Sequence, residues 1–157
     1  MQEHYSRLKQ MYLSAAVNHT LPAPSLQVGD GVCEIDCRFD ERYFHAAGSL
    51  HGAMYFKMLD DAAYFAAASL DAEYFLYTVR FETRLTRPVT TELLHAEGLV
   101  TLRPEMDKEG NFLGGIKAVS RLYAEGKLVA EGTGEFRRGG KKLTDIESYT
   151  QWIRPLF

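Results

Sequence analysis

Three polar features, Lys57 among them, interrupt a long apolar stretch between positions 51 and 70, and they are the first candidates for chemistry in this sequence. His51 and Gly52 stand at the start of the stretch, and Asp60 and Asp61 stand in its middle. A carboxylate within an apolar helix costs free energy unless it is paired or takes part in function. The stretch therefore predicts a helix whose two carboxylates are either paired or functional.

The two carboxylates differ in their neighbours. Asp61 follows Lys57 by four residues, about one helical turn, so the two side chains can form an ion pair. The residues four positions from Asp60 are Phe56 and Tyr64, neither of which is basic, although the Tyr64 hydroxyl can donate a hydrogen bond. Asp60 is therefore the stronger candidate for acid–base chemistry, and a purely structural Asp60 is the alternative.

The start of the stretch has the properties of an anion site. Backbone N–H groups and the positive end of the helix dipole converge there, and Gly52 lets a ligand approach closely. Such an N–H group can polarise a thioester or another carbonyl as its oxygen gains charge. The simpler alternative is that His51 caps the helix and Gly52 only relieves crowding.

The spacing between these features predicts a site shared by two chains. Asp60 follows His51 by nine residues, which places it about 13 Å farther along a helix and about 180° around it. A base and an oxyanion donor must both lie within about 3 Å of the reacting groups. Joint action of Asp60 and Gly52 therefore requires two antiparallel helices related by a twofold axis, and hence a dimer.

The surrounding elements must cover this helix, because a soluble helix that is apolar all round must be buried all round. Short links between the later strands favour antiparallel pairing. We expect an α+β fold, with one curved antiparallel sheet wrapped around a long central helix. The expected elements are an N-terminal helix at 3–18, a strand at 33–39, the helix at 51–70, strands at 74–87, 91–103, 112–125 and 127–138, and a short C-terminal helix.

The 157 residues have the length of one domain, and we expect residues 1–157 to form a single one, with its core at 25–138 and a tail at 139–157. Thr144 and Glu147 have the spacing of a capping box ahead of an apolar set, which predicts the short helix in the tail. That set comprises Ile146, Tyr149, Trp152 and Ile153.

Composition argues against several classes of protein. Lys and Arg number 18 against 21 Asp and Glu, and a net charge of −3 argues against a dedicated nucleic-acid binder. No segment has the pattern of a signal peptide or a lipid-spanning helix. Cys33 and Cys37, four apart on a strand, would lie about 13 Å apart, beyond disulfide reach, and two ligands make no zinc site. We expect a cytoplasmic protein without a metal or a membrane partner.

Several motifs resemble those of one known family. His51-Gly52-Ala53, followed after six residues by Asp60-Asp61, resembles the helix motif of hotdog-fold acyl-CoA thioesterases, the 4-hydroxybenzoyl-CoA thioesterase superfamily. The nearest subgroup contains the phenylacetate-pathway enzyme. The segment from Thr78 to Pro88 and the segment 126–136 are similar to later strands of the same family. The resemblance covers about residues 25–138, in the same order and spacing.

This resemblance implies roles for individual positions. Asp60 matches the catalytic carboxylate, acting as general base on water or as nucleophile, and Gly52 matches the glycine whose N–H holds the thioester oxygen, with His51 beside it. Thr78 stands where relatives place a serine that positions the water, although strand alternation puts it opposite Val79 and Phe81. His45 stands where the family usually has Asn or Gln, which changes the hydrogen-bonding capacity and can change the charge.

Further positions are expected at the substrate. Ala53 stands where the family has a second glycine, and its methyl group is expected to narrow the substrate tunnel of this family. Asp61 and Tyr64 lie on the same expected helix. Arg137 and Arg138 either meet the phosphates of coenzyme A or form a solvated tail. The aromatic residues either form core or line an acyl pocket. No cofactor is implied beyond the coenzyme A of the substrate.

The leading hypothesis is hydrolysis of an acyl-CoA thioester by a homodimer, which can pair further into a dimer of dimers. One alternative keeps the fold and changes the reaction to hydration or dehydration of an acyl thioester, with His45 as the catalytic histidine. The other is a non-catalytic module that binds acyl-CoA.

Overall fold

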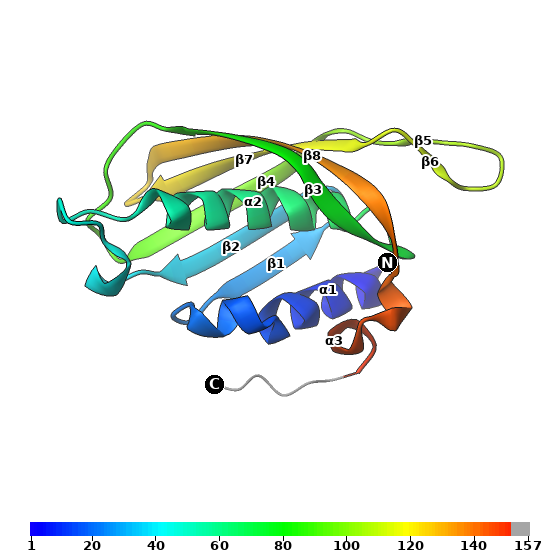
Figure 1. Ribbon diagram of the computed structural model, residues 1–157, viewed down its shortest axis with the longest axis horizontal. Coiled ribbons are helices and arrows are strands. Elements are labelled where there is room, and N and C mark those ends of the chain that lie inside the picture. Colours follow the sequence, from blue (N-terminus) through cyan, green and yellow to red (C-terminus); the bar gives the residue numbers. More distant parts are fainter. Residues whose placement is uncertain (152–157) are drawn as a thin grey trace.

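The computed structural model describes residues 1–151, and it confirms the expected α+β architecture (Figure 1). A sheet with the strand order β1-β2-β4-β7-β8-β3 is antiparallel at every pairing. Its strands are β1 (Ser25–Gly29), β2 (Val32–Arg38), β3 (Tyr74–Leu85), β4 (Leu93–Leu102), β7 (Ile116–Ala124) and β8 (Lys127–Lys142). The α-helices are α1 (Gln2–Ser14), α2 (Gly52–Ala68) and α3 (Glu147–Thr150). The 3-10 turns are η1 (Ala16–Thr20), η2 (Glu41–Tyr43) and η3 (Leu143–Asp145), and β5 (Glu105–Met106) pairs with β6 (Phe112–Leu113).

The curved sheet wraps around α2, the central helix (Figure 1). Alternate residues of β2 point to the core, where Cys33, Ile35 and Cys37 are buried, as a half-buried strand requires. Helix and sheet backbones approach closely at Gly98 of β4, where an added Cβ would lie 2.0 Å from the carbonyl oxygen of Ala62. A side chain at position 98 would therefore push α2 away from the sheet.

The prediction that α2 is buried all round is wrong for a single protomer. The sheet covers one side of the helix, along which residues such as Met58, Ala62 and Ala66 are fully buried. On the uncovered side Ala53 is exposed, Asp60 is half-buried and Phe56 retains 44% of its surface. A sheet of this width curls around only part of a helix, so the apolar residues on the other side stay open in one chain.

Some strand boundaries differ from the prediction. β1 was not anticipated, because it is only five residues long and follows the proline-containing segment 21–24. The expected strand at 112–125 is divided into β6 and β7 at Gly114 and Gly115, of which Gly114 has a φ of 93°. β8 continues to Lys142 through Gly139, where the ring of Tyr77 occupies the space that a Cβ would need.

The ends of the chain also depart from the prediction. α1 stops at Ser14, and residues 16–20 form η1 instead of a continued α-helix. α3 starts after Ile146 without a side-chain cap, so the predicted capping box between Thr144 and Glu147 does not form. Trp152 and Ile153 lie outside the described residues. Cys33 and Cys37 are free and buried.

None of the helices within residues 1–151 is long and apolar enough to cross a membrane.

Candidate active site

Asp60 and Thr78, which are far apart in the sequence, meet on the uncovered side of α2. The Thr78 hydroxyl of β3 donates a hydrogen bond to Oδ1 of Asp60 over 3.0 Å. A register shift in β3 between Thr78 and Arg80 explains why simple alternation misplaces the threonine. The extra residue changes the alternation, so Thr78 bonds to Asp60 while Phe81 packs against Phe56 of the same helix.

Two opposing effects act on the Asp60 carboxylate. Burial raises its pKa above the ordinary value, and the hydrogen bond from Thr78 and the charge of Lys57 partly offset that rise. A carboxylate with a raised pKa is a better proton acceptor than an ordinary aspartate when it is ionised. Asp60 therefore has the electrostatic character of a general base.

Asp61 has the structural partner that its spacing predicts. Lys57 Nζ donates to Oδ2 of Asp61, and both side chains are largely buried. Burial nevertheless raises the pKa of Asp61 to about 6, against the attraction of Lys57. The ion pair accounts for Asp61, whereas Asp60 has only the hydroxyl of Thr78 as a hydrogen-bond donor within the described chain.

The start of α2 carries both a side-chain cap and an unused donor. Nδ1 of His51 accepts a hydrogen bond from the N–H of Ala53 over 3.0 Å, which confirms the capping alternative for His51. The N–H of Gly52, the first residue of α2, has no acceptor within the helix. A Cβ at Gly52 would lie 3.7 Å from Leu85 Cδ2, an ordinary contact. Crowding within the protomer thus does not require glycine there.

His45 holds the loop that leads into α2. Its Nδ1 accepts a hydrogen bond from the N–H of Ala47 over 3.1 Å, and its Nε2 lies 2.9 Å from the hydroxyl oxygen of Ser49. The same loop is closed by a bridge between Phe44 and Leu50. Both ring nitrogens of His45 are therefore engaged within the loop, at the helix end that carries Gly52.

The expected catalytic residues fall into two groups in one protomer. Asp60 and Thr78 form one group, and Gly52, with His51 and His45, forms the other. Gly52 and Asp60 lie on one continuous helix of 17 residues, about 12 Å apart along its axis. A single protomer therefore does not bring the carboxylate and the glycine N–H to one reacting group.

The residues expected at the substrate have different surroundings. Ala53 is exposed in the first turn of α2. Tyr64 lies one turn after Asp60, where its ring packs edge-on against Phe65 at 5.1 Å between centroids. Arg137 is exposed and donates to Oε1 of Glu135 from Nε and Nη2 over 3.0 and 2.8 Å.

Arg138, the other arginine expected at coenzyme A, makes its contacts within the fold. Its Nε and Nη2 donate to the carboxylate of Asp71, whose side chain is fully buried. Its guanidinium carbon lies 3.8 Å from the centroid of the Phe112 ring and 4.7 Å from that of Tyr74. A guanidinium that donates to a buried carboxylate and packs against two rings has few N–H groups left to bind a phosphate.

A pocket beside Asp60 includes residues that the sequence did not mark as functional. Its walls come from the end of α1, from η1, from α2 and from β3, and they include Met11, Tyr12 and Ala15. Helical spacing indicates that Tyr12 and Ala15 share one face of the N-terminal helix. That spacing contains no information about which distant element the face covers.

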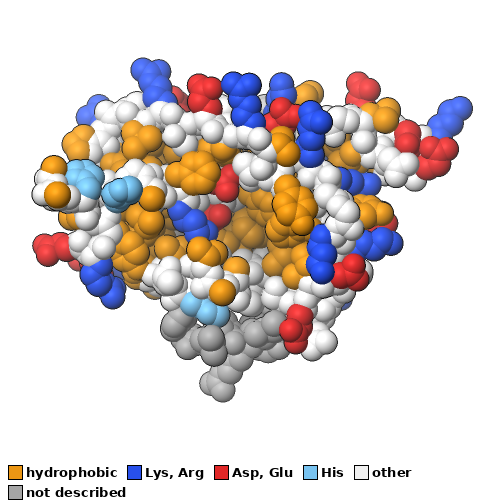
Figure 2. Space-filling model, viewed as in Figure 1, with side chains coloured by type: hydrophobic (Ala, Val, Ile, Leu, Met, Phe, Trp, Pro, Cys, Tyr) orange, Lys and Arg blue, Asp and Glu red, His pale blue; other side chains and the backbone are white. Residues whose placement is uncertain are grey.

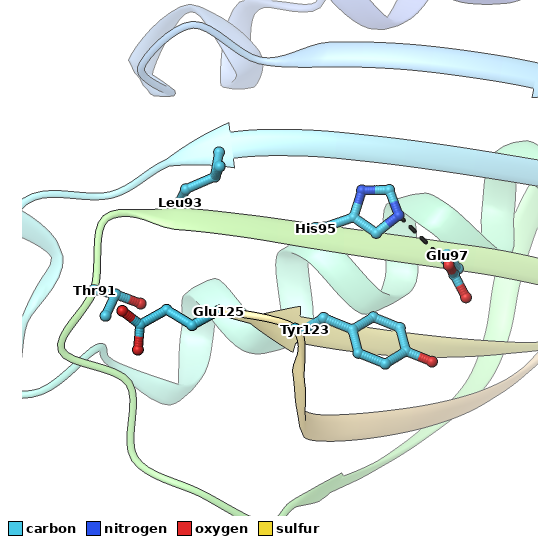
Figure 3. A pocket seen from close by; sticks show the side chains of 7 residues that line it. Thr91, Leu93, His95, Glu97, Tyr123 and Glu125 are labelled. Atoms are coloured by element: carbon cyan, nitrogen blue, oxygen red, sulfur yellow. Dashed lines mark ion pairs between the residues drawn. The ribbon is translucent and has the colours of Figure 1, made fainter.

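A second pocket lies on the opposite face of the sheet, away from α2 (Figure 3). His95 of β4 lies there, with Nδ1 2.9 Å from Asp36 Oδ1 and Nε2 3.6 Å from Glu97 Oε1. Burial opposes the charged form of His95, but the hydrogen bond and charge of Asp36, with further carboxylates, raise its pKa overall. This cluster shares no residue with the Asp60 site.

The fold and the site define an α+β protein of hotdog type, with a half-buried carboxylate on its central helix. Residues 47–101 match the thioesterase superfamily. No match to the chain was found among curated proteins.

Solved structures share this fold over most of the chain. The PaaI protein from the phenylacetic acid degradation operon of E. coli is 16% identical, with a TM-score of 0.75 over 90% of this chain and 96% of that one. A phenylacetic acid degradation-related protein of Ralstonia eutropha JMP134 is 25% identical, with a TM-score of 0.70 over 85% and 98%. A thioesterase family protein of Silicibacter pomeroyi is 21% identical, with a TM-score of 0.73 over 85% and 96%.

The match of residues 47–101 to the thioesterase superfamily agrees with the resemblance of the sequence motifs, and the solved structures share the expected hotdog fold. The superfamily match supports thioester hydrolysis as the general activity.

Proposed function

We propose that the protein hydrolyses acyl-CoA thioesters at a site that two copies of the chain complete together. The observation that carries the proposal is the position of Asp60. This carboxylate has a raised pKa and a hydrogen bond from Thr78, and it lies on a side of α2 that the sheet leaves open. The glycine N–H that would complement it lies at the start of α2, and Asp60 lies in the middle of the same helix.

The surface around Asp60 supports pairing with a second copy. β3 is an edge strand, and three of its apolar side chains are about half exposed: Tyr77 at 49%, Val79 at 54% and Leu85 at 47%. Phe56 of α2 is 44% exposed and packs edge-on against Phe81 of β3. Exposed apolar surface beside an unpaired strand edge favours association, and twofold symmetry would place the two α2 helices antiparallel.

In this proposal each residue has a defined part in the hydrolysis. Asp60 accepts a proton from a water molecule, whose oxygen attacks the thioester carbonyl carbon, and Thr78 keeps the carboxylate oriented. The N–H of Gly52 from the second copy stabilises the negative charge that develops on the carbonyl oxygen. The C–S bond then breaks, and the proton held by Asp60 goes to the departing thiolate, giving free acid and CoA thiol. Direct attack by Asp60 on the carbonyl carbon is the alternative first step.

The first test replaces the carboxylate. Asp60→Asn preserves size and removes the base, so we expect hydrolysis, measured as released CoA thiol, to fall by a factor of about 10² to 10⁴. A thermal unfolding profile like that of the unchanged protein would show that the fold persists. Undiminished turnover, or tight acyl-CoA binding without turnover in the unchanged protein, would contradict the proposal.

The second test asks whether the site uses two chains. Gly52→Pro removes the glycine N–H from one copy, and Asp60→Asn removes the base from the other. If the site is shared, each mixed dimer has one intact site, so an equimolar mixture should regain about one quarter of full activity. A site made within one chain would regain none.

A further inference from the structure

The pocket beside Asp60 lies between the N-terminal segment and the central helix. It has a volume of about 330 Å³ and reaches from Asp60 and Thr78 to the end of α1, where Met11, Tyr12 and Ala15 line it. Figure 2 shows hydrophobic side chains around the hollowed surface on this face of the molecule. The volume lies at the lower end of the range for small-molecule sites, which begins at about 300 Å³.

The wall that α1 provides is firmly attached to the rest of the protein. The ring of His4 links the helix to two elements, with Nε2 3.0 Å from the carbonyl oxygen of Ala68 and Nδ1 2.7 Å from the Tyr149 hydroxyl. Near the pocket, Tyr12 packs edge-on against Phe65 of α2 at 5.3 Å between ring centroids. A wall held by buried hydrogen bonds and ring packing can impose a fixed limit on what enters.

The chemistry of the walls selects against the coenzyme part of a substrate. Lys57 is the only Lys or Arg among the described residues that line the pocket, and it is paired with Asp61. Asp60, which has no paired cation among the described residues, would repel the phosphates of coenzyme A. Met11, Phe65 and Phe75 instead offer apolar and aromatic surface, which suits a hydrocarbon chain or ring.

We propose that this pocket receives the acyl group of the substrate and that Ala15, at the end of α1, limits its length. The inference rests on the proposed hydrolysis, because it places the thioester carbonyl beside Asp60. The acyl group extends from that point towards α1, away from the uncovered start of α2. The N-terminal segment is thus the specificity-determining wall of each protomer.

Position 15 allows a direct test of the length limit. Ala15 has an extended backbone, with φ −62° and ψ 130°, and is half-buried, so a larger side chain can be introduced without breaking a helix. Ala15→Phe should fill part of the pocket, and Ala15→Leu should fill less of it. Ala16→Phe is the matched control, because Ala16 is exposed and lies outside the pocket lining.

The measurement is kcat/KM for acetyl-, hexanoyl- and decanoyl-CoA with each variant. We expect Ala15→Phe to lower the value for decanoyl-CoA by about tenfold or more relative to acetyl-CoA, with a smaller effect for Ala15→Leu and no change of preference for Ala16→Phe. An unchanged preference among the three acyl lengths, whether or not all three kcat/KM values fall equally, would overturn the inference. In either case the hydrolysis proposal would stand.

A binding measurement separates the two proposals further. A decyl thioether of coenzyme A cannot be hydrolysed, so calorimetry can follow its binding in the absence of turnover. We expect Ala15→Phe to weaken its binding by about tenfold, while Ala16→Phe, which lies outside the pocket lining, leaves binding within about threefold. Equal binding by Ala15→Phe and the unchanged protein would refute the pocket assignment, and loss of hydrolysis alone would not.

Discussion

Replacement of Gly52 by proline removes one hydrogen-bond donor and should leave the rest of the helix start unchanged. Proline is well tolerated at the first position of a helix, because the N–H that it lacks has no partner within the helix. His51 has φ −66° and ψ 140°, a conformation that is compatible with a following proline. The cap between His51 and Ala53 can therefore remain in Gly52→Pro, so the helix should be preserved while the proposed oxyanion donor is lost.

The size of the effect follows from the role of that donor. Loss of one oxyanion donor lowers kcat by about 10² to 10³, or about 3 to 4 kcal/mol of transition-state stabilisation. Gly52→Ala is the matched control, because it keeps the N–H and its Cβ would meet Leu85 at an ordinary 3.7 Å within the protomer. We expect Gly52→Ala to lose much less activity than Gly52→Pro.

The assay is release of CoA thiol under saturating acyl-CoA, with thermal unfolding measured on the same samples. Equal losses in Gly52→Ala and Gly52→Pro would refute the reasoning, because a side-chain clash and not a missing donor would then be responsible. Full activity in Gly52→Pro would refute it as well, since the N–H would then have no part in catalysis.

Three further predictions concern the carboxylates and the packing of α2. Thr78→Val removes a hydrogen bond that lowers the pKa of Asp60, so the acid limb of the kcat/KM–pH profile should move to higher pH, and Thr78→Ser should restore it. Asp61 has a folded pKa of about 6 against 3.8, so its contribution to stability is present below pH 3.8 and is lost as the pH rises through about 6. Asp61→Asn should remove that part of the pH dependence in denaturant titrations, and an unchanged difference between the two proteins from pH 4 to 7 would contradict it. Gly98→Ala should cost about 1 to 3 kcal/mol or more of unfolding free energy in urea, because its Cβ would meet the backbone of α2, whereas Gly140→Ala has no atom within 4 Å of its Cβ and should cost little.

The residues of the candidate site differ in how far the sequence could predict their contacts. Lys57 and Asp61 pair because residues four apart on a helix face the same way, and this regularity needs no tertiary information. The partnership of Asp60 and Thr78 depended on a register shift in β3, which alternation cannot reveal. The family resemblance proposed a role for Thr78, and the register shift explains its orientation.

Arg138 shows the opposite case. Arg138 belongs to a basic cluster in the sequence, and this cluster suggested a phosphate site. In the structure its guanidinium donates to Asp71, which lies 67 positions earlier in the chain. No local pattern indicates that pair, because the sheet brings the two residues together only after β3 and β8 have paired.

The sequence by itself determined the central apolar helix, its carboxylates and the antiparallel strands that follow, because periodicity and turn residues act over a few neighbouring positions. It also determined that Gly52 and Asp60 are separated along one helix, since helical rise is fixed. Only the tertiary structure decided which side of that helix stays open, which hydroxyl reaches Asp60 and where α1 closes the pocket. These depend on sheet curvature, a register shift and contacts between distant segments, which no local pattern encodes.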